Sequence, residues 1–292
     1  MIIIMKKIAW IGVGVMGKSM AGHLARSGCD VRVYNRTFEK AKSLEDEIGV
    51  KACASIGQAV TDADYIFSIV GYPKDVEEIY LGDDGIIKQA KKGALAVDMT
   101  TSSPALANEL YHKGKEYGVR IMDTPVSGGD TGAKNATLSI MAGGDKEDFD
   151  EILPLFSIMG KNINYMGGAG SGQHTKAANQ IALAGATAAM IEAIVYAKKV
   201  GLNPEKMLSA IASGAAGSWQ ITNSAPRVLS NDFAPGFFIK HFVKDMEIVK
   251  KEADSCGVKL EVLETVLGLY RDMVSLGYEN DGTQGLIQRY LK

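Results

Sequence analysis

The segment GVGVMG, residues 12–17, sets three glycines at fixed spacing between an apolar run and a helical pattern. The predicted strand, residues 6–14, contains the first two of these glycines and is of the continuous apolar kind expected inside a parallel sheet. In such a unit the first glycine allows a tight turn, the second lets the backbone approach a pyrophosphate, and the third lets the helix pack against the strand. A plain turn that binds nothing is the alternative. The context favours a dinucleotide-binding unit, with phosphate contacts from Gly12, Val13, Gly14, Val15, Met16 and Gly17.

The first half of the chain alternates β-rich runs with helical patterns. Further strands are expected at residues 31–35, 65–71, 94–100, 119–126 and 137–144. Helices are expected at residues 19–28, 38–49, 76–90, 103–118 and 146–160. Ser103 and Pro104 suit the N-cap and the first position of the fourth of these helices. Such alternation predicts a doubly wound sheet with right-handed crossovers.

The strand signals stop after about Gly172. One apolar-rich helical pattern without proline runs from residue 174 to 200, and helices are expected at residues 204–212, 240–257 and 260–277. The predicted fold is an α/β Rossmann-type dinucleotide-binding domain, residues 1–166, followed by an all-α C-terminal domain, residues 167–292. A long interdomain helix joins them, and the second domain is expected to serve substrate binding and oligomerisation.

Charge and cysteine usage exclude several classes of protein. The net charge is −2 and the basic residues are dispersed, which argues against a nucleic-acid-binding surface. The three cysteines, Cys29, Cys53 and Cys256, are isolated, and the four histidines are scattered, so we expect no metal site and no disulfide framework. The short apolar stretch that precedes Lys6 and Lys7 at the N-terminus is too short for a signal segment or a membrane span. We therefore expect a cytoplasmic protein without a membrane partner.

The end of the second predicted strand reads VYNRT and carries no carboxylate. An acidic residue at this place would bind the 2′-hydroxyl of NAD, whereas Asn35, Arg36 and Thr37 favour the 2′-phosphate of NADP. The alternative is that Arg36 is a solvated loop arginine. Ligands bind beyond the carboxyl ends of the strands, so the cofactor-binding set also includes Val70, Gly71 and Thr101.

Two further segments indicate a substrate site. In TPVSGG, Ser127 offers a hydroxyl while Gly128 and Gly129 expose backbone N–H groups, which suits a carboxylate; an ordinary glycine turn is the alternative. On the long helix, Lys176 shares one face with Gln173 and Asn179. A lysine is rarely buried without a partner or a task, although a snorkelling lysine near a helix end is the alternative.

Four segments in order give the chain a resemblance to the β-hydroxyacid dehydrogenase family over essentially its whole length. They are IGVGVMGKSMAGHLARSG, DTPVSGGDTGAKNATLSIMAGG, GGAGSGQHTKAANQ and FVKDM. The family includes 3-hydroxyisobutyrate dehydrogenase, tartronate semialdehyde reductase and the glyoxylate/succinic semialdehyde reductases. The 6-phosphogluconate dehydrogenases look similar but carry a much longer helical domain.

The resemblance implies roles for individual residues. Ser127, Gly128 and Gly129 match the segment that binds the substrate carboxylate, Lys176 matches the catalytic lysine, and Asn179 matches an asparagine that contacts substrate. The family's lysine–aspartate pair near the nicotinamide falls on Lys244, taken as cofactor-binding, and Asp245, taken as substrate-binding. The NRT ending resembles the NADPH-using glyoxylate/succinic semialdehyde reductases. A homodimer or homotetramer is implied too.

These expectations describe an oxidoreductase that moves hydride between NADP(H) and a small β-hydroxyacid or semialdehyde. Lys176 would be the general acid in reduction and the general base in oxidation. One alternative is an NAD-dependent 3-hydroxyisobutyrate or tartronate semialdehyde enzyme, and another is a cofactor-binding scaffold without turnover. Imine reductases resemble this fold but differ at the lysine position. The sequence leaves the hydroxyacid itself, its direction of conversion and the oligomeric state open.

Overall fold

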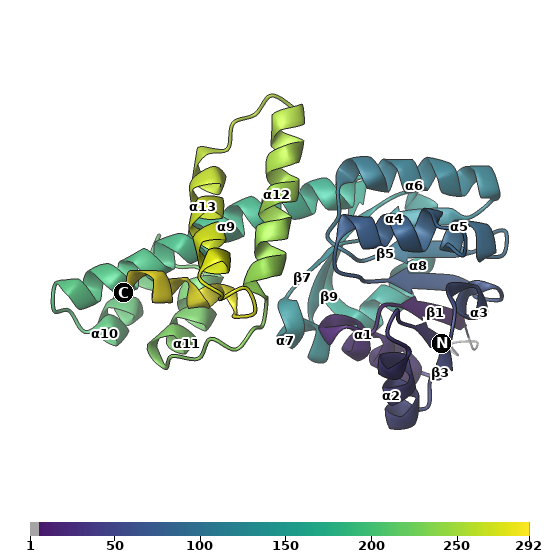
Figure 1. The fold of residues 1–292 in the computed structure, drawn as a ribbon, viewed down its shortest axis with the longest axis horizontal. Helices are drawn as coiled ribbons and strands as arrows, with labels where there is room; N and C mark the ends of the chain where they lie inside the picture. The colour runs from purple at the N-terminus through teal and green to yellow at the C-terminus, as the bar shows by residue number, and fades with distance from the viewer. Residues whose placement is uncertain (1–5, 292) are drawn as a thin grey trace. The chain divides into compact units, whose positions relative to one another are not determined.

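The computed structural model describes residues 6–291. The chain divides into two compact units, one up to Lys176 and one from Ala177 (Figure 1). The Rossmann-type sheet and the all-α second half confirm the predicted fold class. The predicted boundary between residues 166 and 167 stays a prediction.

The first unit is built on one sheet in the order β3-β2-β1-β4-β5-β6-β8-β7, with β9 paired to β8. Strands β1 to β6 are parallel, β8 is antiparallel to β6 and β7, and β9 is parallel to β8. The bounds are β1 Lys7–Ile11, β2 Asp30–Tyr34, β3 Lys51–Cys53, β4 Tyr65–Ser68, β5 Leu95–Asp98, β6 Arg120–Asp123, β7 Val126–Ser127, β8 Leu138–Gly143 and β9 Gly160–Gly167.

The sheet corrects the sequence prediction at three places. The expected strand at residues 119–126 is interrupted after Asp123, where Pro125 has no N–H to donate to a ladder. The short strand β3 and the largely exposed strand β9 were not predicted, because neither shows a clear apolar alternation. Strand β8 is antiparallel to β6 and β7, so the sheet is mixed at this end.

Helices cover both faces of this sheet. Their bounds are α1 Val15–Arg26, α2 Phe38–Ile48, α3 Ile56–Val60, α4 Pro73–Leu81, α5 Ile86–Gln89, α6 Pro104–Tyr117, α7 Gly129–Lys134 and α8 Lys146–Met159. One apolar core lies between the sheet and α1, α2, α7 and α8, and a second lies between the sheet and α3 to α6. Trp10 and Phe67 stack in the first core, with ring centroids 5.5 Å apart.

The expected single helix at residues 76–90 is wrong. Gly82 ends α4 and Gly85 precedes α5, and the chain turns between them. A Cβ at Gly82 would lie 2.5 Å from the carbonyl oxygen of Glu78, so only glycine fits there. The predicted start of α6 is confirmed, because the Ser103 hydroxyl accepts the N–H of Leu106 and Pro104 occupies the first turn.

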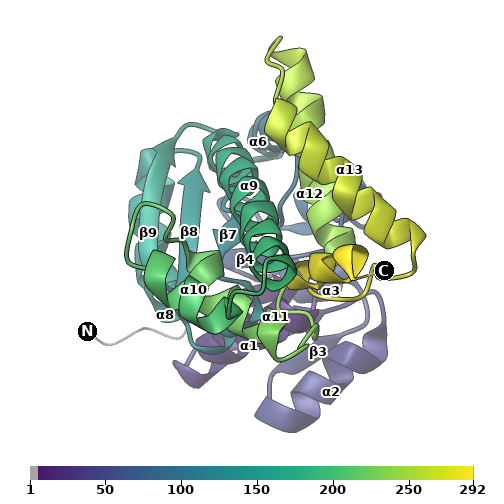
Figure 2. The same cartoon turned by 90° about the vertical axis from the view of Figure 1, so that its left-hand side faces the viewer.

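The described residues of the second unit form helices joined by turns and loops, with one isolated bridge between Phe238 and Gly282 and no strand. Its elements are α9 Ser171–Lys199, which starts in the first unit, α10 Pro204–Ile211, the π-helix η1 Gln220–Ser224, α11 Ala225–Leu229, α12 Ile239–Ser255, α13 Glu261–Ser275 and the 3₁₀ segment η2 Thr283–Tyr290. Helices α12 and α13 pack against each other (Figure 2). The ring of Phe242 lies edge-on to that of Tyr270. The short elements η1, α11 and η2 were not predicted.

Helix α9 is long and apolar enough to cross a membrane. Its residues Ala184, Met190, Ile191 and Ile194 are nevertheless buried in the core of the second unit. We therefore interpret α9 as a core helix.

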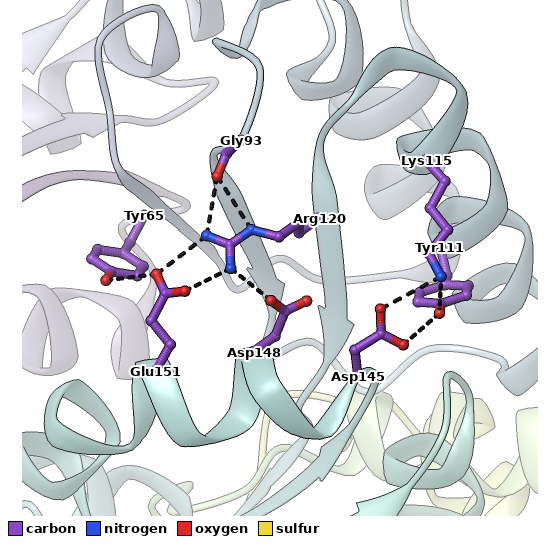
Figure 3. A network of polar contacts seen from close by, with 8 residues as sticks. All are labelled: Tyr65, Gly93, Tyr111, Lys115, Arg120, Asp145, Asp148 and Glu151. Carbon is purple, nitrogen blue, oxygen red and sulfur yellow. Dashed lines mark hydrogen bonds and ion pairs between the residues drawn. The ribbon is translucent and has the colours of Figure 1, made fainter.

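A polar network lies at the amino ends of β4 and β6 (Figure 3). Arg120, the first residue of β6, donates to Asp148 and Glu151 on α8 at 2.6 Å each and to the carbonyl oxygen of Gly93. Tyr65 at the start of β4 donates to the same Glu151 at 2.9 Å. The network therefore joins α8 to the start of two strands.

We expect Arg120→Met to lower the free energy of unfolding by about 2–4 kcal/mol, because it leaves the Asp148 carboxylate buried without its cation. The Asp148 side chain is only 7% exposed. The control is Arg289→Met, which breaks the exposed pair with Asp272 and should cost less than about 1 kcal/mol. Urea unfolding of both variants measures the difference, and equal losses would contradict the interpretation.

Candidate active site

The glycine-rich turn between β1 and α1 is closely packed on one side and open on the other. Gly12 has φ +100°, and a Cβ there would lie 2.2 Å from the carbonyl oxygen of Ile69. A Cβ at Gly17 would lie 2.1 Å from the carbonyl oxygen of Gly12. Gly14 is exposed and has open space where its Cβ would be, just before the first turn of α1. This combination fits a pyrophosphate lying against the backbone at the positive end of a helix.

Asn35, directly after β2, holds this turn in place. Its Oδ1 accepts the N–H of Val13 at 2.9 Å, and its Nδ2 donates to the carbonyl oxygen of Thr37 at 3.0 Å. The Asn35 side chain therefore makes two hydrogen bonds to the backbone, at the place where the ribose of the cofactor is expected. Arg36 and Thr37 are exposed next to it.

Arg36 has a carboxylate partner that the sequence analysis did not foresee. Its Nη1 lies 3.1 Å from Oδ1 of Asp75, in the first turn of α4. The other oxygen of Asp75 accepts the N–H of Tyr72 at 3.0 Å. The end of β2 itself carries no carboxylate, but in the folded chain the carboxylate of Asp75 lies beside Arg36.

The loops after β4 and β5 are joined by one hydrogen bond. The Thr100 hydroxyl accepts the N–H of Val70 at 3.0 Å, which sets the predicted cofactor residues Val70 and Gly71 beside the loop that carries Thr101. Thr101 is half-buried, between buried Thr100 and buried Ser102. All these residues lie beyond the carboxyl ends of the parallel strands, as the sequence predicts.

The Ser127–Gly129 segment leads from β7 into α7. Gly128 and Gly129 have φ +128° and +60°, so the backbone takes a course that other residues rarely adopt. Gly128 is exposed and Ser127 is half-buried. The segment therefore has accessible backbone next to a hydroxyl, which fits a carboxylate ligand.

Lys176 is buried on α9, with 7% of its surface exposed. The turn before it is anchored by Asp123 at the end of β6, whose two oxygens accept the N–H groups of Gly170 and Gln173 at 2.8 Å each. Burial raises the pKa of the Asp123 carboxyl to about 6, against the opposing effect of these two N–H groups. The start of the helix that carries the lysine is thus fixed to the sheet.

In the second unit, three predicted residues lie in one hydrogen-bonded chain with Gln180. Asn179 Nδ2 donates to Gln180 Oε1 at 2.7 Å, and Gln180 Nε2 donates to Asp245 Oδ2 at 2.6 Å. The second oxygen of Asp245 lies 2.9 Å from Lys244 Nζ; the Asp245 side chain is buried and that of Lys244 is 11% exposed. The predicted Asn179, Lys244 and Asp245 are therefore brought together.

Asp75, Asp123 and Gln180 are the polar residues that the sequence analysis passed over. Asp75 sits three positions after Tyr72 and directly follows Pro73 and Lys74, a helix-start pattern that could have placed it beside the loop after β4. Asp123 ends a strand, as cofactor-site residues in this fold often do. Gln180 is four positions after Lys176, a spacing that sets it on the same face of the helix.

Two family models together cover nearly the whole chain. Residues 7–167 match the NAD binding domain of 6-phosphogluconate dehydrogenase. Residues 170–290 match a domain described as NAD-binding of NADP-dependent 3-hydroxyisobutyrate dehydrogenase.

Relatives match over nearly their full lengths. An uncharacterised oxidoreductase of Bacillus subtilis is 49% identical over 98% of this chain and 99% of its own. The 2-hydroxy-3-oxopropionate reductase of Escherichia coli is 34% identical over 97% of this chain and 96% of its own. A Mycobacterium tuberculosis 3-hydroxyisobutyrate dehydrogenase, solved with L-serine, superimposes with a TM-score of 0.90 at 27% identity, covering 98% and 99% of the two chains. The chain therefore belongs to the β-hydroxyacid dehydrogenase family of NAD(P)-dependent oxidoreductases.

Proposed function

We propose that this protein interconverts a small β-hydroxyacid and its semialdehyde with NADP(H), using Lys176 as the general acid and base. The observation that carries the proposal is a buried lysine one turn beyond a helix start that is hydrogen-bonded to the sheet's carboxyl edge. A buried cation at such an edge suits transfer of a proton more than packing. We further propose that the enzyme acts in the cytoplasm.

The chain's own residues divide the chemistry among them. The nicotinamide, when bound, supplies or accepts hydride at the hydroxyl-bearing carbon. In reduction Lys176 donates its proton to the oxygen on which negative charge develops, and in oxidation its neutral amine accepts the alcohol proton. Ser127, Gly128 and Gly129 hold the substrate carboxylate and thereby orient the reacting carbon.

The residues of the second unit complete the proposed assignment. Asn179 contacts the substrate, and Gln180 and Asp245 fix the orientation of its amide through the hydrogen-bonded chain. Lys244 is proposed to contact the cofactor and Asp245 the substrate. The ion pair between them compensates the buried charge of Asp245.

A coupled absorbance assay tests the proposal. It follows NADPH and NADH consumption with methylmalonate, tartronate and succinate semialdehydes and with glyoxylate. Consumption with at least one of them is expected, and the preferred one identifies the substrate. An NAD-dependent 3-hydroxyisobutyrate or tartronate semialdehyde enzyme would show the same reaction with NADH preferred, whereas a scaffold would bind cofactor without consuming it.

Cofactor preference gives a specific prediction. In Asn35→Asp the new carboxylate keeps the acceptor for the Val13 N–H but sets a negative charge where a 2′-phosphate would lie. We expect the ratio of kcat/KM for NADPH to that for NADH to fall by the equivalent of about 1–3 kcal/mol. Asn164→Asp, on an exposed residue of β9, is the control and should leave the ratio unchanged. Unmodified protein that uses NADH as well as or better than NADPH would contradict the NADP assignment.

We also expect a homodimer or homotetramer. The second unit exposes large apolar side chains, including Tyr196 at 67%, Trp219 at 65% and Val262 at 63%. Most of the strongly exposed large hydrophobic residues of the described chain lie in this unit, which favours association through it. Light scattering at micromolar concentration is the measurement, and a monomeric mass would rule the expectation out.

A further inference from the structure

Gln173 connects the start of α9 to the loop after β5 through its side-chain amide. Its Oε1 accepts the N–H of Ser102 at 2.9 Å, and its Nε2 donates to the carbonyl oxygen of Thr100 at 2.7 Å. The two backbone groups flank Thr101, so the amide spans that residue. Gln173 is 2% exposed, and both ends of its amide are satisfied. The amide is suited to this place because it accepts at one end and donates at the other without carrying a charge.

The backbone of the same residue is fixed from a second strand. The N–H of Gln173 donates to Asp123 Oδ2, and the N–H of Gly170 donates to Asp123 Oδ1. The helix start also lies directly on the sheet, because a Cβ at Gly172 would be 2.4 Å from the carbonyl oxygen of Asp123 and 2.5 Å from that of Met141. Neither sliding nor rotation of the first turn is possible without breaking buried hydrogen bonds.

Lys176 follows Gln173 by three positions on this helix and shares its face. We infer that Gln173 is a positioning residue that fixes the distance between Lys176 and the loop carrying Thr101. The inference rests on the proposed role of Lys176. It extends that role by assigning the placement of Lys176 to the amide of Gln173. This amide binds the loop after β5, and Thr100 of the same loop also accepts the N–H of Val70. A small displacement of a proton donor is costly, since a misplacement of about 1 Å can slow a reaction about 10²-fold.

Gln173→Met removes both amide bonds at nearly constant volume. We expect kcat to fall about tenfold to 10²-fold, with NADPH affinity within about twofold of wild type. Gln284→Met is the matched control, because Gln284 is also buried and donates from its amide to two backbone carbonyls, but in the second unit. It should lower stability without lowering kcat.

Gln173→Glu gives a readout that a merely structural role would not produce. The charged glutamate keeps the acceptor for Ser102 but loses the donor to Thr100, whereas the protonated form supplies both. Burial raises the pKa of such a carboxyl, so kcat relative to wild type should recover as the pH is lowered. Asp123 on β6 and Asp98 on β5 carry the neighbouring carboxylates. Wild type is therefore measured over the same pH range, and only a recovery beyond its own pH dependence is assigned to the new carboxyl.

A double-mutant cycle with Lys176→Ala completes the test. If Gln173 acts through the lysine, Gln173→Met should reduce the residual rate of Lys176→Ala by less than about twofold. An equal reduction in both backgrounds, unchanged kcat in Gln173→Met, or a pH-independent defect in Gln173→Glu would overturn the inference. A failure of the proposed function gives a different result, because the single variant Lys176→Ala would then keep its activity.

Discussion

Lys176→Ala is expected to lower kcat by at least the ~10²-fold typical of a lost general acid, with NADPH affinity nearly unchanged. The reason is that the lysine is buried on α9, while the predicted dinucleotide contacts come from the glycine turn after β1 and from Asn35 to Thr37. Lys176→Arg should fail almost as badly, because a guanidinium does not give up its proton at neutral pH. Turnover on the preferred semialdehyde and NADPH binding by fluorescence are measured on each variant.

Lys244 provides the comparison for this experiment. It is a half-buried lysine paired with Asp245, and we propose that it contacts the cofactor. Lys244→Ala should therefore weaken NADPH binding as well as turnover. If Lys176→Ala kept more than about a tenth of wild-type kcat, its loss would be well short of the ~10²-fold expected for a general acid. The proton donor would then have to be another group.

Gly14→Ala is expected to weaken cofactor binding at least about tenfold while the protein folds normally, since about 1.4 kcal/mol of lost contact suffices for that factor. Gly14 has an ordinary negative φ of −82° and open space where a Cβ would lie, so alanine fits the fold. The added methyl group would instead occupy the place where the pyrophosphate approaches the backbone. NADPH titration and thermal unfolding without cofactor separate the two effects.

Two other glycines give the contrast. Gly268 on α13 also has nothing near its Cβ position, and Gly268→Ala should leave NADPH affinity unchanged. Gly17→Ala should destabilise the fold itself, because its methyl group would meet the carbonyl oxygen of Gly12 at 2.1 Å. Equal cofactor affinity in Gly14→Ala and Gly268→Ala would show that no pyrophosphate lies at this turn.

The fold was predictable because its signals are local. Apolar strands, terminal glycines and the change from strand to helix patterns near Gly172 can each be read within a few residues. The elements that were missed carry weak local signals, as in β9, whose residues are mostly exposed or half-buried. The break between α4 and α5 depends on the backbone conformation at Gly82, which periodicity does not reveal.

For the candidate site, the sequence indicated the residues but not their hydrogen-bond partners. Sequence patterns selected residues that the structure sets along the carboxyl edge of the sheet, including Asn35, Val70 and Thr101. Their hydrogen-bond partners were not visible, because Asp123 binds N–H groups 47 and 50 positions later and Gln180 binds a carboxylate 65 positions later. Such pairs arise only from the folded topology. The roles of the site residues stay predictions until the variants are measured.

The central claim is that this chain transfers hydride to a carbonyl carbon, and isotope transfer measures it most directly. Protein is incubated with NADPH deuterated at the transferable position and with each small semialdehyde, and the product is examined by mass spectrometry and NMR. We expect a hydroxyacid carrying a single deuterium on its hydroxyl-bearing carbon, which is a β-hydroxyacid when the substrate is methylmalonate or tartronate semialdehyde. Binding of NADPH with no deuterated hydroxyacid from any of these semialdehydes would contradict the account and leave the cofactor-binding scaffold in its place.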